Sequence, residues 1–287
     1  MDAAPTSLTR PNVLGPGLYL VATPIGNLRD ITLRALDILA GADLILCEDT
    51  RVGGKLLAAH GLKGRLERYD EHAAERTRPK VLRRLAEGAK IALISDAGTP
   101  LVSDPGYRLV REAVAQGAAV FPAPGPSAAL AALTVSGLPT DRFLFAGFPP
   151  PKSAGRVALF QELAPVRATL IFYEGGPRLR ASLTDMAAVF GAREAAVARE
   201  LTKLHETVVR GLLPDLTADP RLDAPRGEIV VLVGPGAEPV ASADEADAAL
   251  AEAVARVGPA RAASEVAKAL GLNRRELYAR ALALKDD

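Results

Sequence analysis

Short runs of apolar residues recur along the chain, and several of them end in a cluster of turn-forming or polar residues. The runs that we interpret as strands are residues 18–22, 44–47, 91–95, 119–122, 143–148, 170–173, 195–198 and 229–233. Segments of helical length separate the early runs, at about residues 31–40, 73–87, 105–116 and 126–136. This repeated order of strand, turn and helix predicts a parallel sheet covered by helices.

The starts of these helices carry recognisable capping residues. Asp30 precedes the first helix, Asp104 stands before Pro105, and Gly125 stands before Pro126, which are residue pairs typical of helix N-termini. Gly137 follows the last of these helices and is suited to end it in a left-handed conformation.

The character of the chain changes near residue 140. Proline and glycine flank the run at 143–148, and beyond it strands come closer together while helices become fewer, which indicates a mixed sheet. After about residue 242 the pattern is helical only and rich in alanine. We therefore predict an α/β protein with a flexible N-terminus (1–14), a parallel-sheet domain (15–138), a mixed-sheet α/β domain (139–238) and a helical unit (242–287).

Composition narrows the classes of protein that fit. Of the 287 residues, 49% are hydrophobic and the net charge is +1, so the chain can bury a core and is no general polycation for nucleic acid. Cys47 is the single cysteine, which excludes an internal disulfide and argues against a structural metal. With no signal peptide at the start and no uninterrupted apolar span, we expect a cytoplasmic protein that does not enter a membrane.

Small, bent and acidic residues follow four successive predicted strands. They occupy residues 23–27, 48–51, 96–106 and 124–128. Ligands of open α/β sheets bind beyond the carboxyl ends of the strands, so these loops predict a ligand crevice. Helix capping and ordinary loop construction explain Asp30 and Asp104 equally well. No glycine-rich dinucleotide motif, phosphate-binding loop or G-x-S-x-G nucleophile motif is present.

A segment with charges of both signs follows the strand at 195–198. If residues 199–206 are extended, Arg199, Leu201, Lys203 and His205 share one face of the strand. This face is either a solvated edge with cross-strand ion pairs or a cleft wall that meets an anionic substrate. Lys152 and Arg156 would extend such a wall.

Several of these segments together resemble a known family. The run at 20–28, then Cys47–Arg51 (C-E-D-T-R), then 94–107 (I-S-D-A-G-T-P-L-V-S-D-P-G-Y) closely resemble small-subunit ribosomal RNA methyltransferases of the tetrapyrrole methylase superfamily. Further matches follow in the same order, at residues 124–128, 147–152, 172–174 and 199–203. The resemblance covers nearly the whole chain, from about residue 13 to residue 285.

This resemblance implies 2′-O-methylation of a cytidine in 16S ribosomal RNA, with S-adenosylmethionine as cofactor. It also implies two α/β domains with the cofactor between them, a homodimer, and free rRNA or the assembled small ribosomal subunit as partner. The superfamily's Gly-Asp-Pro cofactor loop falls on Gly98-Thr99-Pro100, so Thr99 replaces its acidic residue.

Site residues follow from the loops and the resemblance together. For the group that takes the proton we consider Asp49, Glu200 and Lys203, the last only if its pKa is depressed. No metal is required, because the methyl group of a sulfonium is already activated. The predicted cofactor-binding residues are Asp96, Gly98, Thr99, Pro100, Ser103, Ser127, Ala128 and Tyr173. The predicted RNA-binding residues are Arg51, Lys152, Arg156, Arg199, Arg274 and Arg275, with Lys203 contributing to the same charged patch.

The end of the chain predicts a helix, a tight turn at Gly271 and a second helix from Asn273. We expect Val266, Leu270, Leu272, Leu277 and Tyr278 to form its shared core. Arg274 and Arg275 would stand in the first turn of the second helix, where helix-turn-helix units contact nucleic acid. The alternative is a small helical cap with an ordinary solvated surface.

Two other functions remain open from the sequence. One is methylation of a tetrapyrrole or another small molecule, and the other is a non-catalytic nucleic-acid-binding regulator. The charged second domain and the helical unit favour a large polyanion over a small molecule. A regulator would leave the four ligand-like loops without a purpose.

Overall fold

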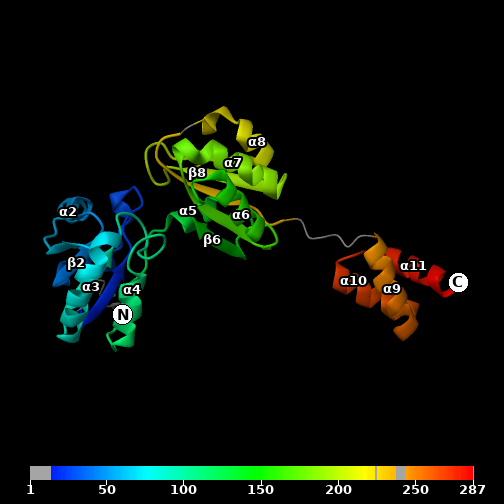
Figure 1. The fold of residues 1–287 in the computed structure, drawn as a ribbon, viewed down its shortest axis with the longest axis horizontal. Helices are drawn as coiled ribbons and strands as arrows, with labels where there is room; N and C mark the ends of the chain where they lie inside the picture. The colour runs from blue at the N-terminus through cyan, green and yellow to red at the C-terminus, as the bar shows by residue number, and fades with distance from the viewer. Residues whose placement is uncertain (1–13, 224, 237–242, 287) are drawn as a thin grey trace, which may run out of the picture. The chain divides into compact units, whose positions relative to one another are not determined.

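The computed structural model describes residues 14–223, 225–236 and 243–286, and the chain divides into two compact units, 1–235 and 236–287 (Figure 1). The predicted flexible segment at 1–14 lies outside the described residues except for residue 14. In the described part of the chain, no helix combines the length and the apolar character that crossing a bilayer requires.

The first sheet of the larger unit is parallel throughout, with strand order β3-β2-β4-β1-β5. Its strands are β1 (Gly17–Val21), β2 (Leu44–Cys47), β3 (Leu66–Arg68), β4 (Lys90–Ile94) and β5 (Val120–Ala123). The helical segments between and after them are η1 (Leu28–Asp30), α1 (Leu33–Gly41), α2 (Thr50–Ala59), α3 (Glu71–Ala86), α4 (Tyr107–Ala115) and α5 (Ala128–Ser136).

Both faces of this sheet are buried, which explains its continuous apolar strands. In β2, Leu44 and Leu46 pack with residues of α3 and α4, whereas Ile45 and Cys47 pack with residues of α1 and α2. Side chains alternate between the faces of a strand, so a strand covered on both sides needs apolar residues at every position.

The second sheet is mixed, with strand order β6-β7-β10-β8-β9, and only the β6–β7 pair is parallel. Its strands are β6 (Phe143–Gly147), β7 (Thr169–Gly175), β8 (Glu194–Arg199), β9 (Thr207–Leu212) and β10 (Glu228–Val233). The accompanying helices are α6 (Ser153–Leu163), α7 (Gly176–Phe190), α8 (Leu213–Ala218) and η2 (Pro220–Leu222). The combination of a parallel and a mixed sheet confirms the predicted fold class.

Helix α5 covers one face of the second sheet, although it directly follows the first. Ala132 and Leu133 pack with Ile171 of β7, Ala198 of β8 and Leu232 of β10. The opposite face packs against α6 and α7. The domain boundary predicted at 138/139 would therefore separate α5 from the second sheet, on which it packs.

Several local expectations are wrong. The sequence pattern did not place helices α2, α6, α7 and α8 or strands β3 and β9. Both strands are only partly buried, which weakens their apolar pattern. Thr32, not Asp30, caps α1 by accepting a hydrogen bond from the Ala35 amide. Helix α4 begins only at Tyr107, so Asp104 is not its cap. Gly137 does end α5 with a φ of 80°, as predicted.

The predicted extended segment at 199–206 is also wrong. Strand β8 ends at Arg199, and Glu200 and Thr202 have positive φ values of 52° and 67°. The Lys203 amide donates to the Glu200 carbonyl at 3.0 Å, which closes a turn. Because the backbone turns here, the side chains of residues 199–206 do not alternate between two faces as they would in a strand.

The smaller unit consists of α9 (Ala243–Val257), α10 (Pro259–Leu270) and α11 (Arg274–Asp286) (Figure 1). Its core holds Ala246, Leu250, Ala262, Val266 and Leu277, among others. Gly271 has a φ of 66°, and the Asn273 side chain accepts a hydrogen bond from the Arg275 amide, so the predicted turn and cap are confirmed.

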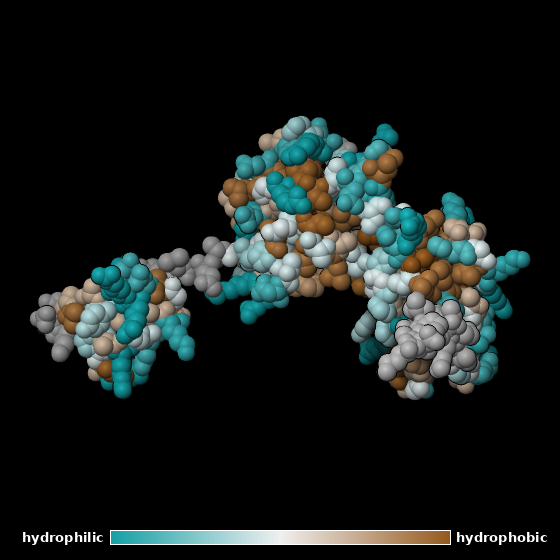
Figure 2. Space-filling view, turned by 180° about the vertical axis from the view of Figure 1, so that it is seen from behind, coloured by the Kyte–Doolittle hydropathy of each residue, from teal (hydrophilic) through white to brown (hydrophobic). Residues whose placement is uncertain are grey.

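One predicted core residue of the smaller unit lies at the surface. Tyr278 is 42% exposed, whereas its neighbour Leu277 is buried. On the face of this unit that Figure 2 shows, at the left, hydrophilic residues are interspersed with hydrophobic ones.

Candidate functional site

A cavity of about 250 Å³ lies beyond the carboxyl ends of β1, β2, β4 and β5. The first sheet and its loops contribute Ile25, Glu48, Asp96, Ala97, Gly98, Thr99, Val102, Ser103, Asp104, Ser127 and Ala128. The second sheet and its loops contribute Phe148, Tyr173, Glu174, Glu228, Ile229 and Val230. The loops that the sequence singled out therefore meet in one hollow, and the second sheet closes it.

Backbone contacts hold the loop around Gly98 in place. Thr23 and Gly98 exchange two amide-to-carbonyl hydrogen bonds of 2.8 and 3.1 Å. The Thr99 hydroxyl donates to the Pro126 carbonyl at 3.0 Å, which ties this loop to the one before α5. Gly98 has a φ of 80°, a conformation that disfavours any residue with a side chain.

Nearly all predicted cofactor-binding residues line this cavity. Asp96, Gly98, Thr99, Ser103, Ser127, Ala128 and Tyr173 are lining residues. Pro100 is the exception, since it is buried and does not line the cavity. The ring of Tyr173 is fixed edge-on by Phe145 and Phe148, at centroid distances of 4.8 and 5.4 Å.

Two lining carboxyls have unusually high pKa values. Partial burial and the neighbouring Asp104 raise the pKa of Glu48 to about 7. Partial burial raises the pKa of Asp104 to about 6. Desolvation also raises the pKa of Asp96. Glu48 and Asp104 therefore change charge much nearer neutral pH than ordinary carboxyls.

Neither carboxyl is among the catalytic candidates that the sequence suggests. The sequence favours Asp49 over the adjacent Glu48, and it predicts a capping role for Asp104. The late start of α4 at Tyr107 removes that capping role. A sequence signal for Glu48 exists, because Glu48 and Asp49 are adjacent acids at the end of β2. Only one of them can cap α2, so the other is free to line the cavity.

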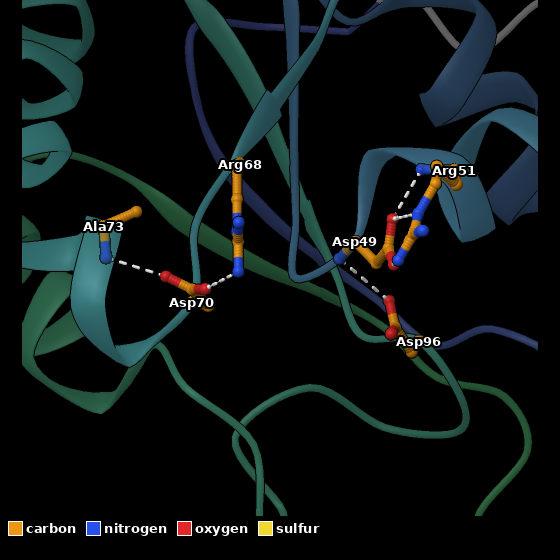
Figure 3. A network of polar contacts seen from close by, with 6 residues as sticks. All are labelled: Asp49, Arg51, Arg68, Asp70, Ala73 and Asp96. Carbon is orange, nitrogen blue, oxygen red and sulfur yellow. Dashed lines mark hydrogen bonds and ion pairs between the residues drawn. The ribbon is translucent and has the colours of Figure 1, made fainter.

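Asp49 is the acid that caps, and Figure 3 shows its contacts. Its carboxylate accepts from the Arg51 amide at 2.8 Å and from the Arg51 guanidinium. These hydrogen bonds lower the pKa of Asp49 to about 2. Asp49 is not among the residues that line the cavity, and such a stabilised carboxylate is a weak base, so we no longer favour it for proton abstraction.

In the same view, Asp70 caps the N-terminus of α3, which begins at Glu71. Its carboxylate accepts from the Ala73 amide at 2.7 Å and pairs with Arg68 at 2.5 Å. The Asp49 amide donates to the Asp96 carboxylate at 3.2 Å, which links the loops after β2 and β4.

Lys203 and Glu200 neutralise each other. The Lys203 ammonium lies 2.9 Å from Glu200 and 3.1 Å from Glu228. Partial burial lowers the pKa of Lys203, but these hydrogen bonds outweigh that effect and the net pKa is raised. The same contact with Lys203 lowers the pKa of Glu200. The depressed pKa that Lys203 needs to act as a base is therefore absent.

The predicted RNA-binding residues of the larger unit have different environments. Arg156 is buried and donates to Asp185 and the Pro151 carbonyl, each at 2.8 Å, so we remove it from the proposed contact surface. Lys152 is exposed, and Arg199 is half-buried with its Nε atom donating to the Arg226 carbonyl at 2.8 Å. The Arg51 side chain is 86% exposed and lies beside the cavity loops.

The high pKa of Glu48 carries a stability prediction. An unfolded glutamate loses its proton near pH 4.3, whereas folded Glu48 keeps its proton to about pH 7, so stability falls as pH rises through this window. After discounting for partial exposure, Glu48→Gln is expected to raise the free energy of unfolding by about 1–2 kcal/mol at pH 8. The gain should largely disappear at about pH 4.5.

Urea unfolding of both proteins at the two pH values measures this difference. The exposed Asp37→Asn on α1 is the matched control and should show no such pH dependence. An equal effect of Glu48→Gln at both pH values would contradict a raised pKa.

Comparison with known proteins agrees with this geometry. A family model described as Tetrapyrrole (Corrin/Porphyrin) Methylases matches residues 17–217, and one described as RsmI C-terminal HTH domain matches residues 240–285. Among solved structures, a uroporphyrin-III-C-methyltransferase from Thermus thermophilus has a TM-score of 0.54 and 22% identity, covering 76% of this chain and 94% of its own. A diphthine synthase has a TM-score of 0.59 and 14% identity, covering 76% and 89%. These structures share the fold.

Relatives with higher identity cover both units. A protein of Mesorhizobium japonicum named Ribosomal RNA small subunit methyltransferase I is 52% identical over 275 residues, or 95% of this chain and 94% of its own. Proteins with the same name from Erythrobacter litoralis and Escherichia coli O157:H7 are 53% and 44% identical, covering 95% and 92% of this chain and 96% and 94% of their own. The chain belongs to the tetrapyrrole methylase family of methyltransferases. Within that family it groups with the ribosomal RNA small subunit methyltransferases I, as its motifs predict.

Proposed function

We propose that this protein transfers a methyl group from S-adenosylmethionine to the ribose 2′-hydroxyl of a cytidine in 16S ribosomal RNA. The observation that carries this proposal is the identity of about half of all residues with ribosomal RNA small subunit methyltransferases I, across both units of the chain. The substrate is free rRNA or the assembled small subunit.

The lining of the cavity fits the proposed cofactor. S-adenosylmethionine carries a positive sulfonium and a positive ammonium, which acidic side chains attract. The lining holds five acidic residues, Glu48, Asp96, Asp104, Glu174 and Glu228. Ile25, Phe148, Ile229 and Val230 offer apolar surface for a purine ring. Backbone of the loops at 96–100 and 127–128 can approach the ligand closely, because these residues are small or bent. When bound, the cofactor supplies an already activated methyl group, and no metal is needed.

The protein's main task is to hold the ribose oxygen in line with the methyl group. Alignment of this kind can lower a reaction barrier by about 7–11 kcal/mol. We propose that Arg51, Lys152 and Arg199 contact phosphates near the target nucleotide, and that Arg274 and Arg275 dock more distant RNA. Arg274 and Arg275 are exposed in the first turn of α11, consistent with this role.

Two alternatives have specific weaknesses. The small-molecule methyltransferases that share the fold cover 76% of this chain, which leaves the C-terminal unit unexplained by that function. A non-catalytic regulator would not need the cavity or its acidic lining. We further propose that the protein acts in the cytoplasm, where ribosomes are assembled, and, from the family resemblance, as a homodimer.

Nucleoside mass spectrometry of 16S rRNA from a strain lacking this protein tests the function. We expect one 2′-O-methylcytidine to disappear, and to return when the wild-type chain is expressed. A complete set of 2′-O-methylcytidines in the deleted strain would refute the proposal. Purified protein should also transfer labelled methyl groups to small subunits from that strain in preference to a porphyrinogen or corrinoid precursor.

A further inference from the structure

Glu48 and Asp104 are neighbouring carboxyls in the wall of the cavity. Glu48 directly follows β2, and Asp104 lies in the long loop between β4 and α4. Two ionised carboxylates in contact repel each other, so such a pair retains one shared proton near neutral pH and titrates as a unit. Burial is the main cause of their raised pKa values, about 7 and about 6, and the charge of Asp104 raises the pKa of Glu48 further.

Asp104 also lines a second cavity, of about 420 Å³. Tyr69, Arg78, Tyr107 and Arg108 contribute to the wall of this space together with Glu71 and Glu75, and Tyr107 is 66% exposed. Arg78 pairs with Glu112 at 2.8 Å and Arg108 with Glu75 at 3.7 Å, so a phosphate would compete with these acids. An exposed aromatic ring beside arginines is the combination that binds a nucleobase and its phosphates. Asp104 thus stands between the space suited to the cofactor and a space suited to a nucleotide.

We propose that the Glu48–Asp104 pair is the general base that takes the 2′-hydroxyl proton of a nucleotide entering from the second cavity. This inference rests on the proposed function. The pair is better placed than Asp49, which is held by Arg51, or Lys203, which is held by Glu200 and Glu228.

The step balances without any further reactant. The hydroxyl proton passes to a carboxylate oxygen of the pair, and the ribose oxygen forms a bond to the methyl carbon. The bond between that carbon and sulfur breaks, its electron pair stays on sulfur, and the sulfonium becomes a neutral thioether. The pair then releases its proton to solvent.

The surrounding charges favour a basic pair before the cofactor binds and a more acidic one afterwards. Further acids face the pair or share its cavity, namely Asp96, Glu174 and Glu228. Tyr173 also lines this cavity, and Cys47 lies beside Glu48. The second cavity, which Asp104 also lines, is bordered by two arginines, two glutamates and two tyrosines: Arg78, Arg108, Glu71, Glu75, Tyr69 and Tyr107. A sulfonium in the same cavity adds positive charge, which lowers the pKa of a carboxyl. Binding of S-adenosylmethionine near pH 7 should therefore release a proton.

The experiment compares wild type, Glu48→Gln, Asp104→Asn, the double variant and the control Asp37→Asn on full-length protein. Single-turnover methylation of small subunits is measured from about pH 5.5 to 8.5, and calorimetry with S-adenosylmethionine is run in two buffers of different ionisation enthalpy. We expect the wild-type rate to rise through a midpoint between about 6 and about 7 and then level off. Each single variant should shift the midpoint downward, because the remaining acid loses its acidic neighbour.

The double variant should lower the rate by about 10²–10⁴-fold, abolish the pH dependence and release no proton on binding the cofactor. Calorimetric affinity and a melting curve confirm that it is folded. A rate within about threefold of wild type, or an unchanged midpoint in both single variants, would overturn the proposal. If wild type itself methylates no RNA, the proposed function fails instead.

Tyr107→Ala tests the direction from which the nucleotide enters. It should raise the KM for small subunits at least about fivefold and leave the proton release unchanged, because stacking is worth about 1–3 kcal/mol per base. Tyr107→Phe should restore most of the affinity. An unchanged KM in Tyr107→Ala would remove the second cavity from the path of the substrate.

Discussion

Gly98→Val is expected to weaken S-adenosylmethionine binding at least about 100-fold. Gly98 lines the cavity with a φ of 80°, and an added Cβ would lie 3.3 Å from Ile25 and 3.7 Å from the Pro126 carbonyl. A branched side chain is strained by about 1–2 kcal/mol in this conformation and would also fill space that the cofactor needs. Isothermal calorimetry measures the change in Kd.

Gly61→Val separates strain from loss of the site. Gly61 has a similar φ of 66°, nothing lies within 4 Å of its added Cβ, and it does not line the cavity. We expect Gly61→Val to lower the melting temperature about as much as Gly98→Val while binding the cofactor normally. A Kd for Gly98→Val within threefold of wild type would show that the loop at 96–100 does not contact the cofactor.

Deletion of residues 236–287 is expected to lower methylation of small ribosomal subunits at least about tenfold while changing S-adenosylmethionine affinity less than twofold. The C-terminal unit has its own apolar core. The core between α5 and the second sheet, which includes the cavity-lining Ile25, lies within residues 1–235. Among the described residues of this unit, none lines the cavity. Methyl transfer to purified subunits and calorimetry of the shortened chain measure the two quantities, and full-rate methylation by that chain would contradict the docking role.

A finer test removes charges one at a time. Arg274→Ala and Arg275→Ala should each reduce the slope of log affinity against log salt by about 0.7–0.9, if each arginine contacts one phosphate. Arg261→Ala on α10 removes an equally exposed charge outside the first turn of α11 and serves as the control. Equal slopes for all three variants would show that this turn has no special role in RNA docking.

The sequence by itself predicted eight of the ten strands of the two sheets and the strand-end loops that line the cavity. Residues 44–47 appear as an uninterrupted apolar run because helices cover both faces of β2, and local pattern is sufficient to detect that. The turn at Gly271 and the helix end at Gly137 were equally predictable, since each depends on a residue's own backbone preference. Short motifs in the loops at the strand ends also identified the family, and the comparison with known proteins confirms it.

Only the tertiary structure decided which charged residues are available for chemistry. Arg156 pairs with Asp185, 29 positions away, and Lys203 pairs with Glu228, 25 positions away. Glu48 and Asp104 come to line one cavity only when the loops after two strands lie side by side. Burial there raises the pKa values of both carboxyls, whereas Arg51 lowers that of Asp49. Burial and Coulomb interactions depend on distance in space, and separation along the chain does not reveal that distance.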